Sequence, residues 1–257
     1  IGNLELLPAY VHDYDEALIC CPKASMKQMH RIINLCKEAG KPFRTLPSMI
    51  ELVSGHVSVK QFREVSLIDL LGRDEITLDE SLISSYLHGK RVMITGAGGS
   101  IGAELVRQCL KYEPALLVML DNSEYNLFEI DREILHLQTN VLIKPVLSNI
   151  RDMNILDKVF QEFEPQVVLH AAAYKHVPMQ EAFPWEAIKT NVHGTSNMVK
   201  ASLEHYVEKF VLVSTDKAVK PVNVMGATKR LAELICQGAN TDSGTKVRAV
   251  RFGNVLG

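Results

Sequence analysis

Hydrophobic and polar positions divide the chain into two segments that meet near residue 78. In the first segment, a short apolar run at residues 16–21 precedes helical periodicity over residues 25–39. A second short apolar run follows at residues 42–46. This order predicts one βαβ unit. Residues 55–78 show no sustained periodicity, which favours a connector.

The second segment alternates strand-like and helical patterns. Nearly continuous apolar runs predict strands at residues 91–95, 115–120, 141–147, 166–171, 209–214 and 247–251. The stretches between them predict helices at about residues 101–112, 124–138, 153–163, 185–205 and 225–238. A short helix at residues 79–88, capped by Asp79, leads into this series. The alternation predicts an α/β fold with a doubly wound parallel sheet whose strands are covered on both faces.

We therefore expect two domains. Residues 1–78 would form part of a smaller α/β domain with its connector, and residues 79–257 a Rossmann domain. A lone βαβ unit leaves most of its sheet edge unpaired, so the first segment is expected to belong to a larger sheet.

Composition narrows the class of protein. The chain has 257 residues, 47% of them hydrophobic, and a formal net charge of −2, which is typical of a globular protein. No run of basic residues indicates binding to nucleic acid or lipid, so we expect a small anionic partner. The five cysteines form no CxxC pair, which favours buried thiols, a reducing cytoplasmic compartment and no metal site. No apolar run approaches the length of a membrane helix.

A glycine-rich loop follows the first strand of the second segment and leads directly into a helix. It reads Thr95-Gly96-Ala97-Gly98-Gly99-Ser100-Ile101-Gly102. Gly96 permits a tight turn, Gly99 lets the backbone approach a pyrophosphate, and Gly102 allows close packing of the helix on the strand. Free N–H groups at the helix start favour phosphate. The loop predicts a dinucleotide site.

Asp121 follows the next strand, where an acidic side chain can accept hydrogen bonds from the adenosine ribose. A carboxylate at this position repels a 2′-phosphate, and residues 122–125 contain no arginine to attract one. The pattern therefore favours NAD over NADP.

The stretch STDKAVKPVNVMGATK carries the candidate chemistry. Thr215, Asp216 and Lys217 come at the carboxyl end of a strand, where doubly wound sheets present ligand-binding groups. Met225 and Lys229 are four residues apart, so they share one face of the following helix. A thioether cannot titrate, so acid/base work must fall to other side chains.

Five segments together resemble the extended short-chain dehydrogenase/reductase superfamily, and within it the nucleotide-sugar 4,6-dehydratases of bacterial polysaccharide and glycan synthesis. They are VMITGAGGSIGAEL (92–105), HAAAYKHVP (170–178), KTNVHGT (189–195), STDKAVKPVNVMGATKR (214–230) and VRFGNVLG (250–257). Methionine in place of the catalytic tyrosine within MGATK is typical of the large, membrane-associated branch that acts on UDP-N-acetylglucosamine. Residues 1–88 resemble, more weakly, an accessory domain upstream in that branch.

The resemblance implies a role for each matching residue at the reaction centre. Lys229 would hold the nicotinamide ribose, Thr215 would contact the sugar 4-OH, and Asp216 and Lys217 would handle the C6 hydroxyl and the C5 proton. Met225 occupies the position of the tyrosine.

The resemblance also implies the contacts to the cofactor and the rest of the substrate. The strand end at Ala171, Ala172 and Ala173 would pass beneath the cofactor, Lys175 would meet its pyrophosphate, and Asn191 would lie nearby. The chain has Ser148-Asn149-Ile150 where the family usually has Gly-Asp-Val, so Asn149 and Ile150 would meet the adenine through a different group. His176 and Asn254 would bind substrate, Asn254 at its diphosphate.

The implied reaction removes water from a UDP-N-acetylhexosamine such as UDP-N-acetylglucosamine and gives a 4-keto-6-deoxy sugar. NAD takes a hydride from C4 and returns it to C6. We expect Lys217, when neutral, to remove the C5 proton and protonated Asp216 to release the C6 hydroxyl, although the sequence leaves open which of the two acts first as base. The 4-OH proton would pass from Thr215 through water to Asp216.

Two other readings stay open. A UDP-sugar 4-epimerase shares the fold and the first hydride step but needs no elimination pair. A catalytically silent NAD-binding regulatory module would explain Met225 as lost chemistry, which the retention of Asp216, Lys217 and Lys229 together disfavours. We further expect a homo-oligomer, a longer parent protein anchored at the cytoplasmic face of the bacterial inner membrane, and substrate-binding residues after Gly257.

Overall fold

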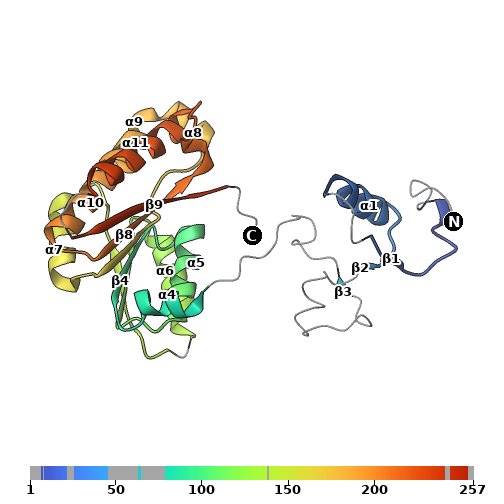
Figure 1. Ribbon diagram of the computed structural model, residues 1–257, viewed down its shortest axis with the longest axis horizontal. Coiled ribbons are helices and arrows are strands. Elements are labelled where there is room, and N and C mark those ends of the chain that lie inside the picture. Colours follow the sequence, from blue (N-terminus) through green and yellow to red (C-terminus); the bar gives the residue numbers. More distant parts are fainter. Residues whose placement is uncertain are drawn as a thin grey trace. The chain divides into compact units, whose positions relative to one another are not determined.

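The computed structural model describes most of the chain, namely residues 7, 9–21, 26–45, 63–64, 79–137, 139–240 and 244–253. It divides into two compact units, Ile1–Leu78 and Asp79–Gly257 (Figure 1). The division falls where the sequence pattern changes. The accessory role of the first unit stays a prediction.

The first unit contains the expected βαβ unit. Strand β1 (Ala17–Ile19) pairs in parallel with β2 (Phe43–Thr45), and helix α1 (Met26–Glu38) connects them. Helix α1 packs Ile32, Ile33 and Cys36 against Ile19 of β1, which explains its apolar periodicity. A further strand, β3 (Arg63–Glu64), pairs antiparallel with β2 inside the segment expected to be a connector. Two residues are too few to give a periodic signal.

The second unit is built on a six-stranded parallel sheet with the order β6-β5-β4-β7-β8-β9. The strands are β4 (Arg91–Thr95), β5 (Leu116–Asp121), β6 (Leu142–Leu147), β7 (Val167–His170), β8 (Lys209–Thr215) and β9 (Lys246–Phe252). Each expected strand is present. The chain order reverses between β4 and β7, and a doubly wound sheet opens a ligand-binding crevice at such a point.

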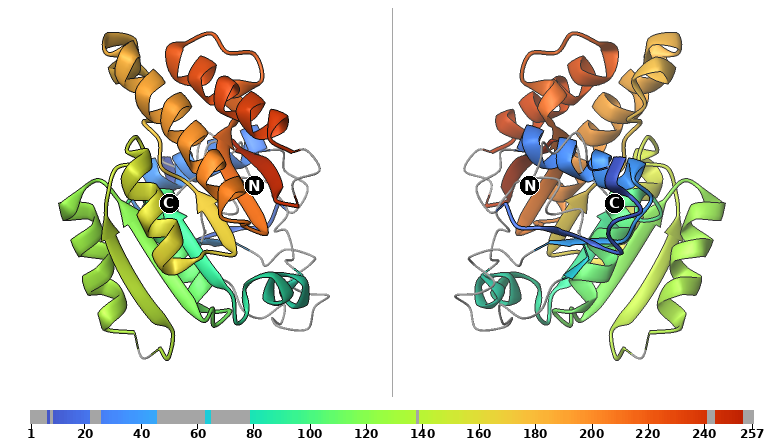
Figure 2. Two further views of the ribbon diagram at one scale, coloured as in Figure 1. Left: turned by 90° about the vertical axis from the view of Figure 1, so that its left-hand side faces the viewer. Right: turned by 90° about the vertical axis from the view of Figure 1, so that its right-hand side faces the viewer.

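Helices cover both faces of this sheet (Figures 1 and 2). One face packs against α5 (Ser100–Leu110) and α6 (Glu124–Leu135). The other packs against α7 (Met153–Phe163), α10 (Thr195–Glu204) and α11 (Val224–Gly238). Side chains of β4 alternate between the two cores, Val92 and Ile94 in one and Met93 in the other.

Several helices begin at a residue whose side chain caps them. Asp79 caps α4 (Glu80–Leu87) by accepting from Leu82 N, and Asp152 caps α7 in the same way. The helix expected at residues 185–205 is instead three consecutive pieces, α9 (Pro184–Ala187), a π-helical segment η2 (Ile188–Gly194) and α10. Two short elements were not expected, α8 (Val177–Ala182) and the 3-10 turn η3 (Asp216–Ala218).

Two expectations about burial are wrong. The edge strands β6 and β9 are largely exposed, because a strand at the end of the order has a neighbour on one side only. Cys20 and Cys21 are exposed, whereas the other three cysteines are buried. Burial raises the pKa of Cys109 and Cys236 to about 12, so these two thiols are unreactive.

Candidate active site

The glycine-rich turn between β4 and α5 is tight for reasons visible at single atoms. Gly96 has φ +67, and its carbonyl oxygen accepts a hydrogen bond of 3.0 Å from Gly99 N. A Cβ on Gly96 would lie 2.7 Å from the Ala172 backbone, and one on Gly102 would lie 1.9 Å from Gly96 O. Larger residues are therefore excluded from both positions, and the backbone is left open to a ligand.

A cleft of about 420 Å³ lies over this turn at the carboxyl ends of the strands. It is lined by Gly96, Gly99, Leu120, Asp121, Asn122, Ser123, Asn126, Ser148, Asn149, Ile150, Ala171, Ala172, Ala173, Tyr174 and Thr190. The structure thus brings together residues that the sequence placed on four separate strand ends. Ser100 and Ile101 form the first turn of α5 behind it.

Asp121 is buried at the end of β5 and held in a fixed orientation. Its carboxylate accepts from Gly98 N and from Ser123 N, each over 2.9 Å. A carboxylate oxygen accepts more than one hydrogen bond, so capacity remains for ribose hydroxyls.

Lys175 lies at the start of helix α5, because its Nζ donates to Ser100 Oγ over 2.9 Å. The helix start supplies free N–H groups and the lysine adds a positive charge. This pair suits a pyrophosphate. Together with the glycine turn and Asp121, the residues present fit a dinucleotide.

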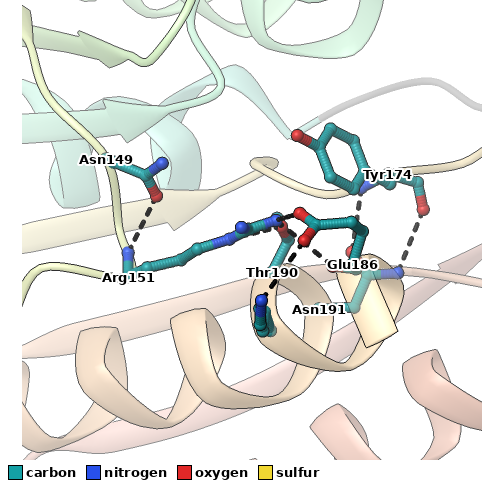
Figure 3. A network of polar contacts seen from close by, with 7 residues as sticks. Asn149, Arg151, Tyr174, Glu186, Thr190 and Asn191 are labelled. Carbon is teal, nitrogen blue, oxygen red and sulfur yellow. Dashed lines mark hydrogen bonds and ion pairs between the residues drawn. The ribbon is translucent and has the colours of Figure 1, made fainter. Parts of the chain in front are cut away.

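The outer end of the cleft is fixed by an arginine network (Figure 3). Arg151 donates through Nε to Thr190 Oγ1 over 2.9 Å and through Nη2 to Glu186 Oε2 over 2.6 Å. Its guanidinium also lies 5.7 Å from the centre of the Tyr174 ring. Arg151 N donates to Asn149 Oδ1, which closes a turn over residues 149–151. The sequence reading did not include Arg151, Glu186 or Thr190.

Asn191 is 1% exposed and holds the loop after β7 rather than facing the cleft. Its Oδ1 accepts from Tyr174 N over 2.8 Å, and its Nδ2 donates to Tyr174 O (Figure 3). Nδ2 also donates to Thr228 Oγ1 of α11 over 3.1 Å. Asn191 thus ties the cleft wall to the helix that carries Met225 and Lys229, and its expected place near the cofactor stays a prediction.

His170 is a buried polar residue in the middle of the unit. Its ring nitrogens lie 2.6 Å from Thr95 Oγ1 and 3.0 Å from Thr195 Oγ1. Burial first, and the charge of Lys229 second, lower its pKa to about 3, so it is neutral. It links β4, β7 and α10.

Thr215, Asp216 and Lys217 form one hydrogen-bonded group at the carboxyl end of β8. Thr215 Oγ1 donates to Asp216 Oδ1 over 3.0 Å, and Lys217 Nζ donates to the same oxygen over 3.2 Å. These two contacts, that of Thr215 first, hold the pKa of Asp216 below its ordinary value. The lowered pKa favours the carboxylate form of Asp216, which can accept the 4-OH proton that the sequence analysis routes to it.

Met225 and Lys229 are both buried on α11, on the face towards β8. Lys229 Nζ donates to Val213 O over 2.8 Å, two residues before Thr215. Burial lowers the pKa of Lys229 to about 8. Met225 offers no titratable atom, so the titratable groups among these neighbours are Lys229 and the side chains of Asp216 and Lys217 at the end of β8.

A second charged group braces the same elements and was missed from sequence. Glu233 of α11 is 6% exposed and accepts from Ser214 Oγ over 2.7 Å and from Arg251 through two hydrogen bonds of 2.8 Å. Arg230 adds a bond of 3.0 Å. The Arg251 contact first, with those of Ser214 and Arg230, lowers the pKa of Glu233 to about 2. Glu233 fixes β8 and β9 against α11.

Two residues, His176 and Asn254, were expected to bind substrate. His176 is exposed and precedes α8. Asn254 lies outside the described residues. Within the described parts of the chain, no group of three or more metal-binding side chains is present, and no helix combines the length and apolar character needed to cross a membrane.

The sheet order, the glycine-rich turn, the acidic residue after the next strand and the Met225–Lys229 pair define the class of the protein. It is an α/β domain of the extended short-chain dehydrogenase/reductase superfamily. Within that class, the chain belongs to the family described as "Polysaccharide biosynthesis protein", which matches residues 92–257.

Curated relatives support the same placement. "Capsular polysaccharide biosynthesis protein CapD" of Staphylococcus aureus is 41% identical over 100% of this chain and 43% of its own length. "UDP-N-acetylglucosamine 4,6-dehydratase (inverting)" of Campylobacter jejuni is 35% identical over 66% of this chain and 50% of its own. "UDP-glucose 4-epimerase" of Rickettsia rickettsii is 36% identical over 65% and 49%. The chain spans half or less of each of these relatives.

Solved structures confirm the fold. Pen from Bacillus thuringiensis has a TM-score of 0.63 and 34% identity, covering 67% of this chain and 53% of its own. DesIV, the dTDP-glucose 4,6-dehydratase of Streptomyces venezuelae, was solved with NAD bound. Its TM-score is 0.55 at 25% identity, and the match covers 63% of this chain and 55% of DesIV. The expected superfamily and sheet architecture are confirmed.

Proposed function

We propose that the chain is the NAD-binding catalytic core of a nucleotide-sugar 4,6-dehydratase that acts on a UDP-N-acetylhexosamine. The observation that carries the proposal is the hydrogen-bonded Thr215-Asp216-Lys217 group at the end of β8, beside buried Met225 and Lys229. A water elimination needs an acid and a base on neighbouring carbons, and this group supplies both. The Campylobacter relative's name supports the substrate class.

The cleft over the glycine turn would hold NAD. Asp121 would take its adenosine ribose, the start of α5 with Lys175 its pyrophosphate, and Lys229 the ribose of the nicotinamide. Bound there, NAD would supply a hydride acceptor for C4 of the sugar and a hydride donor for C6. The presence of NAD in the related DesIV structure supports this assignment.

The contacts at the end of β8 suggest how the 4-OH proton leaves without a tyrosine. Thr215 already donates its hydroxyl proton directly to Asp216, so a proton taken from the 4-OH by Thr215 has an acceptor in place. Asp216 begins as a carboxylate and becomes protonated in this step. It can then give that proton to the C6 hydroxyl, which leaves as water.

Lys217 remains for the C5 proton. It must have released its ammonium proton to solvent before it removes this proton. Lys217 then returns the proton to C5 as a hydride reaches C6. The substrate loses one water, and each residue ends in its starting state.

The proposal also covers partners and location. We expect the complete protein to form homo-oligomers and to associate with the cytoplasmic face of the bacterial membrane. The family's description and the CapD relative support a place in polysaccharide synthesis.

The test follows C6 of the sugar by proton NMR while the complete protein acts on UDP-N-acetylglucosamine. Dehydration gives a new methyl doublet. A 4-epimerase, the second candidate that the Rickettsia relative supports, would give a new sugar whose C6 is still a CH2OH group, so no methyl doublet would appear. An unchanged sugar with NAD bound would favour the catalytically silent NAD-binding module and contradict the proposal.

A further inference from the structure

The amino ends of β8 and β9 lie at the opposite edge of the sheet from the Thr215-Asp216-Lys217 group. A hollow of about 440 Å³ at this edge is lined by residues that include Lys209, Thr245 and Lys246. We propose that the hollow binds a phosphate dianion, either free phosphate or the phosphoryl group of a monoester. It shares no lining residue with the cofactor cleft, so it is a second ligand site.

Two lysines stand opposite each other at the hollow. Lys209 of β8 and Lys246 of β9 are register partners on adjacent parallel strands, so their side chains leave the sheet on the same face. Two ammonium groups held on neighbouring strands repel each other. Burial first, and then the charges of Lys246 and Lys90, lower the pKa of Lys209 against the opposing charge of Glu208. A bound anion would relieve this repulsion.

The positive charge around the hollow exceeds the negative charge. Glu208 accepts from Lys90 Nζ through both of its oxygens, over 2.8 and 2.9 Å, and from Gln166 Nε2 over 2.9 Å. Its charge is therefore matched by Lys90. In the part of the chain that the structure describes, no carboxylate forms an ion pair with Lys209 or Lys246. Two positive charges thus remain, on a chain whose formal net charge is −2.

Lys209 is held in position without losing its charge. Its Nζ lies 3.3 Å from the centre of the Tyr86 ring of α4. The face of an aromatic ring attracts an ammonium group but does not neutralise it. An ammonium group has three N–H donors and no acceptor. Lys209 is therefore oriented by the fold and keeps the charge that an anion needs.

A polar atom without a partner marks the same place independently of charge. Thr245 is 3% exposed, and its Oγ1 has no hydrogen-bond partner among the described residues. Buried hydroxyls are rarely left unpaired. Because Thr245 lines the hollow between the two strands, an oxygen of a bound phosphate would accept from this hydroxyl.

The two uncompensated lysines favour a dianion over a singly charged ligand. A phosphate monoester carries close to two negative charges above about pH 7 and has three acceptor oxygens. Hydrogen bonds between ammonium groups and phosphate oxygens are charge-assisted and therefore strong. A phosphodiester, such as the headgroup of an anionic lipid, carries a single negative charge and leaves one lysine uncompensated. The hollow should therefore select monoesters.

The test is titration calorimetry of the complete protein at about pH 8 and low salt, with saturating NAD to keep the cofactor cleft occupied. The probes are inorganic phosphate, glycerol 3-phosphate and the diester glycerophosphoglycerol. Lys209→Gln and Lys246→Gln each remove one charge, and Thr245→Val removes the hydroxyl while keeping the shape of the side chain. Lys158→Gln, at an exposed position of α7, is the matched control.

We expect wild-type protein to bind phosphate or glycerol 3-phosphate with a dissociation constant of about 1 mM or lower, and the tighter of the two identifies the source of the phosphoryl group. Lys209→Gln and Lys246→Gln should each weaken binding at least about fivefold, and Thr245→Val about threefold, whereas Lys158→Gln should change nothing. The diester should bind at least about tenfold more weakly.

Stability without ligand separates binding from a structural role. Lys246→Gln removes a repulsion, so the unfolding temperature of the phosphate-free protein should stay the same or rise. A lysine needed for folding would lower it. Binding that Lys246→Gln leaves unchanged, equal binding of the diester, or no binding of either monoanionic-free probe, phosphate or glycerol 3-phosphate, would overturn the inference.

Discussion

The site has two halves: the cleft over the glycine-rich turn, called the cleft half, and the Thr215-Asp216-Lys217 group at the end of β8, called the strand-end half. They differ in how far the folded chain already buries and pairs their polar groups. In the cleft half, Asp121 is buried and its carboxylate already accepts hydrogen bonds from two backbone N–H groups. In the strand-end half, the side chains of Asp216 and Lys217 are 55% and 41% exposed and form an ion pair of 3.2 Å. The chain thus preorganises cofactor binding, whereas its reacting groups depend on the substrate to exclude water.

The comparison also separates affinity from chemistry. Buried pairs that tie several strands together resist substitution because they hold the fold, while an exposed ion pair contributes little to stability. Variants in the two halves should therefore fail in different ways. Those at the end of β8 should lose turnover and keep the cofactor, and those in the cleft should lose the cofactor.

The largest expected effect is on turnover at the end of β8. Asp216→Asn and Lys217→Ala should each lower product formation by at least about 1,000-fold, because each removes a proton-transfer group. NAD binding, measured by titration calorimetry, should change less than about threefold. Lys220→Ala, an exposed lysine three residues on, is the matched control. Near-normal turnover by either variant would remove these residues from the mechanism.

The reverse pattern is expected at the glycine turn. Gly102→Ala places a Cβ 1.9 Å from Gly96 O, which must shift the backbone that approaches the pyrophosphate. We expect a loss of about 3 kcal/mol in unfolding free energy and at least a tenfold loss in NAD affinity. Gly238→Ala, at the end of α11, meets no atom within 4 Å and serves as control. Normal NAD affinity in Gly102→Ala would show that the turn does not bind the cofactor.

A smaller effect is expected at Glu233, which braces the end of β8 against α11 and β9. Glu233→Gln removes the charge that holds Arg251 and Ser214 and should lower the unfolding free energy by about 2 kcal/mol at pH 7. The folded pKa of Glu233 is about 2, below its ordinary value of 4.5, so this stability is complete above pH 4.5 and is lost as the pH falls towards 2.

Urea unfolding at pH 7 and pH 4 checks this linkage. The difference between wild type and Glu233→Gln should narrow by roughly 1 kcal/mol at the lower pH. Glu162→Gln, at an exposed position of α7, should show no such change. A difference that stays constant with pH would mean that the charge of Glu233 contributes nothing.

The smallest effect is expected at the methionine. Met225→Tyr should change turnover by less than about threefold, because Thr215 already donates to Asp216 and the proton has a path. Steady-state rates with UDP-N-acetylglucosamine measure this. A gain of orders of magnitude would identify the site as a tyrosine enzyme that has lost its tyrosine.

Local sequence signals predicted the tight glycine turn and the helix cap at Asp79. Both depend on residues close together in the chain, so their spacing carries the information. The alternation of apolar runs likewise predicted every strand of the large sheet, since burial imposes that pattern. Exposed edge strands break the rule of two covered faces, because an apolar run shows that a strand exists and not where it lies in the sheet.

Polar pairs between residues far apart in the chain could not be predicted from the sequence. Glu233 lies on an amphipathic helix, where a glutamate usually faces water, and its partner Arg251 belongs to a different element. The same holds for Arg151, whose partner Glu186 lies 35 residues away. The ionised state of Asp216 also depends on contacts to its neighbours that the sequence does not specify.

The most direct test of the account follows the hydrogen at C4 of the sugar. UDP-N-acetylglucosamine carrying deuterium at C4 is incubated with the complete protein, and the product is examined by NMR and mass spectrometry. A dehydratase that uses the end of β8 as described should place that deuterium in the new C6 methyl group. Product that keeps deuterium at C4, or sugar that gains no methyl group, would contradict the account.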